Sequence, residues 1–273
     1  MLARVMITTG LFFSCCIASS CGVAQDRATQ LQLKKRQDQL KKTTVEKKIP
    51  AARSTYMGRK IAQTMHYSGA QWLIRDKRER EERCSLMLAN LGVKRGQSIC
   101  DMGCGNGFHS LPLAKMTGTT GQVIGVDVQP EMLKLLRDRM ETQGIENVIP
   151  ILGSYHNPRL PRNSIDIILL VDVYHEFSHP GFMLDAMRKS LKPGGVVVLV
   201  EYRAEDPEVP IKPLHKMSKK QVDKEMVANG FTLEQNIEGE SELTVGDAIT
   251  RTLTAQIQGT TPVLIPQRFK EET

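Results

Sequence analysis

From Ser98 to about residue 202, short apolar runs alternate with longer segments in which apolar residues recur every three or four positions. The apolar runs predict strands, at 97–102, 122–127, 147–152, 164–171 and 194–202. The periodic segments predict helices, at about 107–116, 130–142 and 179–190. This alternation is typical of an α/β fold with a doubly wound, mostly parallel sheet and helices on both faces.

Both flanks extend this pattern. A helix near 218–229 and a strand near 231–237 are predicted on the C-terminal side, whereas the segment from Ser241 to Thr273 shows no clear pattern. On the N-terminal side, Met57, Ile61 and Met65 recur at every fourth position. Residues 56–91 are therefore predicted to form a helical lid and a first helix that ends at Gly92.

The first 24 residues resemble a targeting segment. Arg4 precedes the apolar run VMITTGLFFSCCIA, which is too short for a comfortable membrane span and is followed by small residues. Three fates are open: cleavage after Ala24, lipidation of Cys21, or retention as an anchor. We expect a signal peptide or membrane anchor at 1–24, and hence a protein that is exported to the periplasm or beyond, or anchored to a membrane.

Charge separates the next segment from the rest of the chain. The chain carries a formal net charge of +7, but eight basic and three acidic residues fall between Asp26 and Lys48 alone. Residues 25–50 are predicted to be a charged linker, and 51–273 a nearly neutral domain with its core at about 84–240. This distribution predicts no nucleic-acid partner. It leaves membrane association through the leader open and gives no indication of the oligomeric state.

Cysteine spacing indicates neither a disulfide framework nor a metal site. Three of the six cysteines, Cys15, Cys16 and Cys21, fall in the leader. The remaining sequence contains no Cys-x-x-Cys pair, and no metal is predicted.

A glycine-rich turn follows the first predicted strand of the α/β region. Asp101 ends the strand, and Gly103, Gly105 and Gly107 precede a helix. Glycines allow a sharp turn and the close approach of a ligand to the backbone. Asp101 is placed to meet a cationic group directly or through a water.

The second strand ends at Asp127, where a carboxylate can accept hydrogen bonds from both hydroxyls of a ribose, with Val128 against an adenine. A dinucleotide fingerprint would require glycine or alanine at position 108, where this chain has Phe108. This departure disfavours a nicotinamide cofactor.

The chain resembles the class I S-adenosylmethionine-dependent methyltransferase family. The resemblance rests on DMGCGNG at 101–107, the acid at 127, and LKPGG before the fifth strand. The resemblance covers roughly residues 56–237. It implies a sheet of the seven-stranded type, S-adenosylmethionine as the cofactor, and contacts of the acids and glycines with it. Many relatives carry an acid after strand three, whereas this chain has Gly153 and Ser154, so the adenine contact is expected to pass to a backbone carbonyl or the Ser154 hydroxyl.

The fourth strand runs into polar and aromatic residues at the edge where ligands of such sheets bind. Asp172 is expected on the cofactor side, His175 as a general base, and Tyr174 and Glu176 as walls and orienting groups. A structural role for His175 is the alternative, and His215 is a second, weaker candidate. Of the lid, Tyr56 and Arg59 could contact ligand, and Trp72 is expected in the core.

These observations predict a methyltransferase that acts on an unidentified, small-molecule acceptor. The leader leaves a second hypothesis open: an exported, non-catalytic nucleoside- or metabolite-binding protein that retains the fold.

Overall fold

The computed structural model describes residues 49–205, 207, 209, 211–237 and 248–255. The chain divides between Pro50 and Ala51, and the description below concerns the second unit. The predicted leader and almost all of the predicted linker lie outside the described residues. Within the described residues, no helix is both long enough and apolar enough to cross a bilayer.

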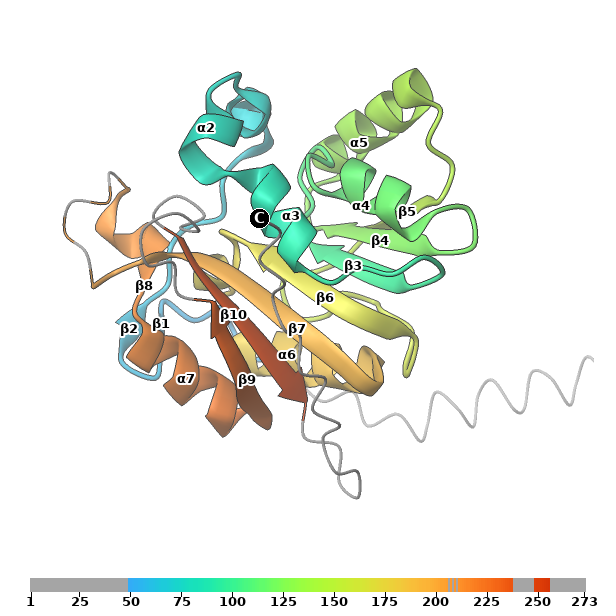
Figure 1. The fold of residues 1–273 in the computed structure, drawn as a ribbon. Helices are drawn as coiled ribbons and strands as arrows, with labels where there is room; N and C mark the ends of the chain where they lie inside the picture. Colours follow the sequence, from blue (N-terminus) through green and yellow to red (C-terminus); the bar gives the residue numbers. More distant parts are fainter. Residues whose placement is uncertain (1–48, 206, 208, 210, 238–247, 256–273) are drawn as a thin grey trace, which may run out of the picture. The chain divides into compact units, whose positions relative to one another are not determined.

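The main sheet has eight strands, seven of which follow one another in the order β5-β4-β3-β6-β7-β10-β9, while β8 pairs with β7 (Figure 1). The strands are β3 (Ser98–Met102), β4 (Gln122–Asp127), β5 (Val148–Leu152), β6 (Ile165–Val171), β7 (Leu191–Arg203), β8 (Lys216–Met217), β9 (Phe231–Ile237) and β10 (Ala248–Ala255). Neighbours from β5 to β7 pair in parallel, and β10 runs antiparallel to both of its neighbours. The predicted mostly parallel sheet of the seven-stranded type is confirmed.

Helices cover both faces of this sheet. They are α2 (Arg78–Glu82), α3 (Cys84–Asn90), α4 (Ser110–Thr117), α5 (Pro130–Gln143), α6 (Pro180–Ser190) and α7 (Lys219–Ala228). Because side chains alternate along a strand, one set of strand residues packs with α6 and α7 and the other with α3, α4 and α5. Figure 1 shows these two helical layers on opposite sides of the sheet.

The helix boundaries follow local sequence signals. Pro130 occupies the first turn of α5, which ends at Gly144 in the left-handed conformation. Ser218 caps α7 by accepting a hydrogen bond from the backbone N–H of Gln221. The ends of these helices are therefore fixed by short-range chemistry.

The segment before α2 differs from the prediction of a helical lid. Residues 56–66 are not helical: β1 (Thr55–Tyr56) and β2 (Arg59–Lys60) form a hairpin, and a 3-10 helix, η1, spans Tyr67–Ile74. Met57 and Gly58 make the two-residue turn with positive φ values of 47° and 102°, which a continuous helix does not allow. The fourfold spacing of methionine and isoleucine was a misleading signal here.

The region predicted as the first helix is also broken. It forms α2 and α3, joined at Arg83, whose φ of 47° interrupts the helical path. Beyond β9, the chain returns as β10 between β7 and β9, within a tail for which the sequence predicted no element.

Gly107 provides a test of packing between the glycine turn and α5. Its φ is +81°, and an added Cβ would lie 2.3 Å from Cδ1 of Leu136. We expect Gly107→Ala to lower the free energy of unfolding by about 2–4 kcal/mol, through overpacking and left-handed strain together. Gly144→Ala is the matched control, because Gly144 has a φ of +61° but open space at Cβ. Equal destabilisation of the two variants in urea melts would contradict this packing role.

Candidate functional site

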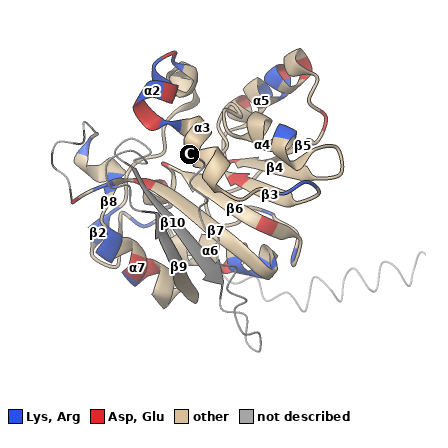
Figure 2. Cartoon of the chain, in the orientation of Figure 1, with Lys and Arg blue, Asp and Glu red and all other residues tan. Residues whose placement is uncertain are grey.

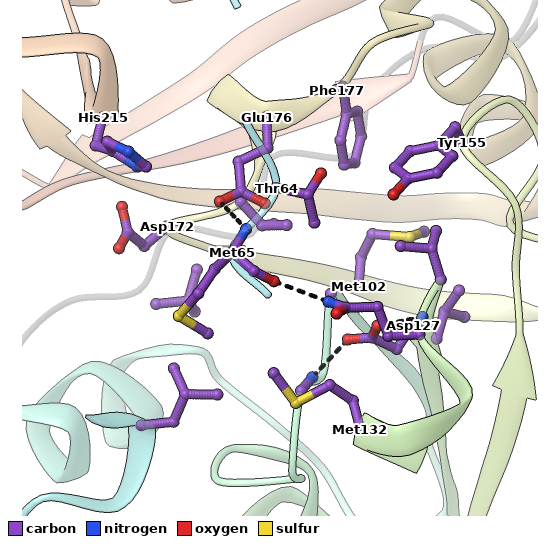
Figure 3. Close-up of a pocket in the computed structure, with 18 of the residues that line it drawn as sticks. Thr64, Met65, Met102, Asp127, Met132, Tyr155, Asp172, Glu176, Phe177 and His215 are labelled. Atoms are coloured by element: carbon purple, nitrogen blue, oxygen red, sulfur yellow. Dashed lines mark hydrogen bonds between the residues drawn. The ribbon is translucent and has the colours of Figure 1, made fainter. Parts of the chain in front are cut away.

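The carboxyl ends of β3, β4, β5 and β6 border a cavity of about 520 Å³, where parallel sheets of this type bind ligands. Segments from the lid close another side of it (Figure 3). Its lining includes Met65, Trp72, Leu73, Arg78, Gly103, Gly105, Asp127, Val128, Gln129, Ser154, Tyr155, Asp172, Glu176, Phe177, Lys212 and His215. In Figure 3, Asp172, Glu176 and His215 lie at one end of the view and Asp127 at the other.

Two of the three predicted glycines reach this cavity. Gly103 and Gly105 line it with φ values of 73° and 52°. Gly107 does not line it, and its missing side chain makes room for Leu136 of α5. The glycines thus serve both purposes expected of such a turn, namely access to the backbone and close helix packing.

Asp127 joins the ends of two loops inside the cavity. Its Oδ2 accepts a hydrogen bond from the Gly105 N–H at 3.0 Å, and its Oδ1 accepts one from the Gln129 N–H at 2.8 Å. Burial raises the pKa of this carboxyl, although these backbone hydrogen bonds oppose the shift. Val128 lines the cavity beside it.

Asp101 does not line the cavity. It is 3% exposed, and its Oδ2 accepts a hydrogen bond from the Ser110 hydroxyl at 2.5 Å. Burial raises its pKa to about 6. The expectation of direct contact with a ligand is therefore wrong for this structure, because the carboxylate is turned to the start of α4; contact through a water stays a prediction.

The segment after β5 is placed as the sequence suggested. Ser154 and the neighbouring Tyr155 line the cavity, while Gly153 is buried beneath them and donates its N–H to the Asp127 carbonyl oxygen. A Cβ at Gly153 would lie 3.0 Å from Cγ1 of Val126. Only Ser154 of the predicted pair is therefore positioned for a side-chain contact.

Two side chains that line the cavity form hydrogen bonds with the lid. The Gln129 amide accepts a hydrogen bond from the Tyr67 N–H and donates one to the Met65 carbonyl oxygen, each at 2.8 Å. Glu176 Oε1 accepts the Met65 N–H at 3.1 Å. Gln129 and Glu176 thus fasten the same short segment from opposite loops.

Of the lid residues singled out from the sequence, Trp72 lines the cavity and is 42% exposed, so its predicted place in the core is wrong. The Arg75 guanidinium lies 3.6 Å from the centroid of its ring. Tyr56 and Arg59 do not line this cavity; Arg59 instead forms a buried ion pair with Glu225.

The fastening by Gln129 predicts a local effect. In Gln129→Ala the Tyr67 amide loses its acceptor, and we expect its hydrogen exchange to quicken by about tenfold, since a hydrogen bond of this kind contributes about 0.5–1.5 kcal/mol. Gln143→Ala, at the exposed end of α5, is the control. Unchanged exchange at Tyr67 in the first variant would show that the lid is held by other contacts.

His175 is fully buried and does not line the cavity. Its Nδ1 lies 2.6 Å from Glu201 Oε2, and its Nε2 lies 2.9 Å from His215 Nδ1. The expectation that His175 directly contacts a substrate as its base is not met, because His215, Glu176 and Asp172 form the surface in front of it.

Tyr174 is placed differently from the expected pocket wall. It is 0% exposed, and its hydroxyl donates to Glu225 Oε2 at 2.7 Å in the core against α7. The expectation that Tyr174 orients a ligand is wrong, since its side chain packs against Glu225 and does not line the cavity. Glu176 lines the cavity as expected.

Burial and mutual proximity shift the pKa values of Asp172, Glu176 and His175. Burial raises the pKa of Asp172 to about 7, reinforced by the Glu201 carboxylate, and burial also raises that of Glu176 to about 7. Burial alone would lower the pKa of His175, but Glu201 raises it to about 9. The carboxylates at this end of the cavity are poorly solvated, and a bound cation would stabilise their negative charge.

Glu201 and Gln129 are site residues that the sequence analysis missed. Glu201 interrupts the apolar run of β7 at its carboxyl end, a signal that points to the same edge as Asp127. Gln129 offers no such signal, because only the folded position of Met65 gives it a partner.

The comparisons with known proteins agree with this architecture. Residues 93–255 match the family described as a methyltransferase domain. The chain belongs to this methyltransferase domain family. The predicted family is confirmed, and the predicted class of enzyme and the predicted cofactor, S-adenosylmethionine, agree with it.

Curated relatives resemble part of this methyltransferase domain. The ubiquinone/menaquinone biosynthesis C-methyltransferase UbiE of Cupriavidus pinatubonensis is 30% identical over 115 residues, covering 42% of this chain and 47% of the relative. The demethylmenaquinone methyltransferase of Staphylococcus aureus is 30% identical over 125 residues, 46% of this chain and 50% of the relative. The chain thus matches about half the length of these relatives.

A solved structure, that of a SAM dependent methyltransferase from Aquifex aeolicus, shares the fold with a TM-score of 0.63 and 24% identity. The match covers 69% of this chain and 99% of that one. At this identity, the likeness supports the architecture alone.

Proposed function

We propose that this methyltransferase domain transfers a methyl group from S-adenosylmethionine to a small, largely apolar acceptor. The observation that carries the proposal is a single cavity that joins the glycine turn and Asp127 to Asp172, Glu176 and His215. A cofactor site and a polar substrate site in one cavity are the minimum that transfer between two bound molecules requires.

The residues present fit S-adenosylmethionine. Gly103 and Gly105 line the cavity, and their missing side chains let Val173 and Leu73 pack against the turn, since added Cβ atoms would lie 2.5 Å and 2.7 Å from them. Asp127 would hold the ribose hydroxyls. Arg78 also lines the cavity, but it is paired with Glu82 at 2.8 Å and would have to share its charge with a carboxylate of the methionine portion. When bound, the cofactor supplies a methyl group on a positively charged sulfur.

Acidic side chains dominate the other end of the cavity. Asp172 and Glu176 favour the binding of a cation such as the sulfonium of the cofactor, which contributes to binding and not to the rate of transfer. The chain's contribution is then to position the two molecules and to exclude water under the lid, which Gln129 and Glu176 fasten.

The acceptor is proposed to be an aromatic small molecule of the quinol type. Tyr155, Phe177 and Ile211 give the cavity apolar walls next to His215 and Lys212. The relatives from Cupriavidus and Staphylococcus are named for quinone methylation, which makes quinols the first acceptors to examine. In Figure 2, acidic and basic residues are interspersed along the described helices and strands.

The test is formation of S-adenosylhomocysteine by the full chain with a panel of small acceptors that includes short-chain demethylmenaquinol. Turnover with at least one aromatic small molecule, lost in Asp127→Ala, is the expected result. Binding of S-adenosylhomocysteine without turnover across the panel would instead favour the non-catalytic, metabolite-binding alternative.

The leader bears on where this reaction takes place. We propose export or anchoring through residues 1–24, and the mass of the natural N-terminus separates cleavage, lipidation and retention. An anchored domain facing the cytoplasm would have access to S-adenosylmethionine where it is made.

A further inference from the structure

We propose that His175, His215 and Glu176 bind a divalent transition-metal ion of the zinc type at the end of the cavity away from Asp127. One ligand atom from each of these residues lies within 4.8 Å of those from the other two. Two imidazoles with one carboxylate form a donor set that suits zinc and neighbouring first-row ions. The residues come from η2 (Tyr174–Glu176) and η3 (Pro213–His215), so sequence spacing does not reveal them.

The two imidazoles face each other through one ring nitrogen of each, which are hydrogen-bonded. His175 Nε2 and His215 Nδ1 are 2.9 Å apart. Two imidazole nitrogens that share one tetrahedral ion, each at about 2.0–2.1 Å from it, lie roughly 3.3 Å apart. The observed pair is a hydrogen bond, and an ion would replace its shared proton once the two rings turn and separate by a few tenths of an ångström.

Glu201 completes the pattern typical of a metal-binding histidine. It is 1% exposed, and its Oε2 accepts the Nδ1 hydrogen of His175 at 2.6 Å. A carboxylate in this position fixes the tautomer so that the opposite nitrogen carries a lone pair for the ion, and it increases the basicity of that nitrogen.

The charge of the cluster also calls for a cation. Asp172, Glu176 and Glu201 bring three carboxylates to two histidines, and no lysine or arginine among the described residues forms an ion pair with them. Asp172 Oδ1 is buried without a hydrogen-bond partner, in a residue held at a φ of 52°. Buried carboxylates are stable when paired or bound to a metal, and Asp172, whose Oδ1 lies 3.8 Å from His175 Nδ1, is placed to be a charge partner of the site.

The position of the site suggests that the ion would bind the acceptor. Asp172, Glu176 and His215 line the cavity, so the open coordination positions would face the acceptor. If the proposed methyl transfer holds, an ion here would bind an acceptor oxygen and lower its pKa. Metal binding itself is independent of that function.

The test is titration of the chelator-treated full chain with Co²⁺, followed by visible d–d absorption, without S-adenosylmethionine. We expect one saturable site per chain that Zn²⁺ displaces. His215→Ala should weaken it by more than about 100-fold. Glu201→Gln, which keeps the shape of the side chain that contacts His175 and the Tyr174 N–H, should weaken it by about 10–100-fold. His156→Ala is the control and should bind like the parent chain.

Thermal unfolding supplies a second readout that also verifies folding of the variants. Zn²⁺ should raise the Tm of the parent chain and of His156→Ala, but not that of His215→Ala. The proposal is overturned if Co²⁺ shows no saturable binding, or if His215→Ala and Glu201→Gln bind it as the parent chain does. The histidine pair would then be an ordinary hydrogen bond, and the proposed methyl transfer would still stand on its own test.

Discussion

Asp127→Ala is expected to weaken the binding of S-adenosylhomocysteine by at least about 100-fold. Asp127 is placed to accept hydrogen bonds from two ribose hydroxyls, and bonds to a charged group contribute about 1.5–3 kcal/mol each. Two of them correspond to about 3–6 kcal/mol, hence a factor of 100 or more in the dissociation constant. Calorimetric titration of parent and variant measures this directly.

The same substitution also releases the loops beside the ligand. Asp127 accepts the N–H groups of Gly105 and Gln129, so its removal leaves a buried donor without a partner and loosens the glycine turn. Asp138→Ala is the matched control, because Asp138 is an acid on the exposed face of α5 paired only with Lys134. Similar affinities for parent, Asp138→Ala and Asp127→Ala would remove Asp127 from the cofactor site.

Glu225→Ala is expected to lower the free energy of unfolding by about 3–5 kcal/mol. Glu225 is 0% exposed on α7 and accepts hydrogen bonds from Arg59, Tyr174 and Gln221. Its loss leaves the Arg59 guanidinium, whose side chain is 10% exposed, without its counter-charge, and breaking a buried pair from one side costs about this much.

The consequence extends to the site, because Arg59 also donates to the His175 carbonyl oxygen at 2.9 Å and so ties the β1–β2 hairpin to η2. Urea unfolding measures the effect, and Asp138→Ala again serves as the control, since an exposed helix pair contributes only about 0.3–0.5 kcal/mol. A loss in Glu225→Ala no larger than in that control would show that the Arg59–Glu225 pair contributes nothing to stability.

The parts of this fold that were predictable from sequence are those encoded locally. The apolar strands, the turn through Gly103 and Gly105, and the acid at Asp127 each follow from neighbours within a few residues. β4 and β9 span the predicted residues, and α5 differs by a single residue. Local signals sufficed because a buried parallel strand and a capped helix need no distant partner to be recognised.

What the sequence did not reveal depends on contacts between distant segments. Trp72 lines the cavity because the lid crosses it, and His175 is hidden because His215, forty positions away, packs in front of it. Tyr174 turns from the cavity to Glu225, a partner whose importance only the packing of α7 reveals. The end of the cavity that contains Asp172, Glu176 and His215 was therefore the least predictable from sequence.

The most direct test of the central claim, that this cavity binds S-adenosylmethionine, is calorimetric titration of the full chain with S-adenosylhomocysteine and, separately, with NAD. We predict one S-adenosylhomocysteine bound per chain with a micromolar dissociation constant and no binding of NAD. Absence of S-adenosylhomocysteine binding, or equal affinity for NAD, would contradict the claim.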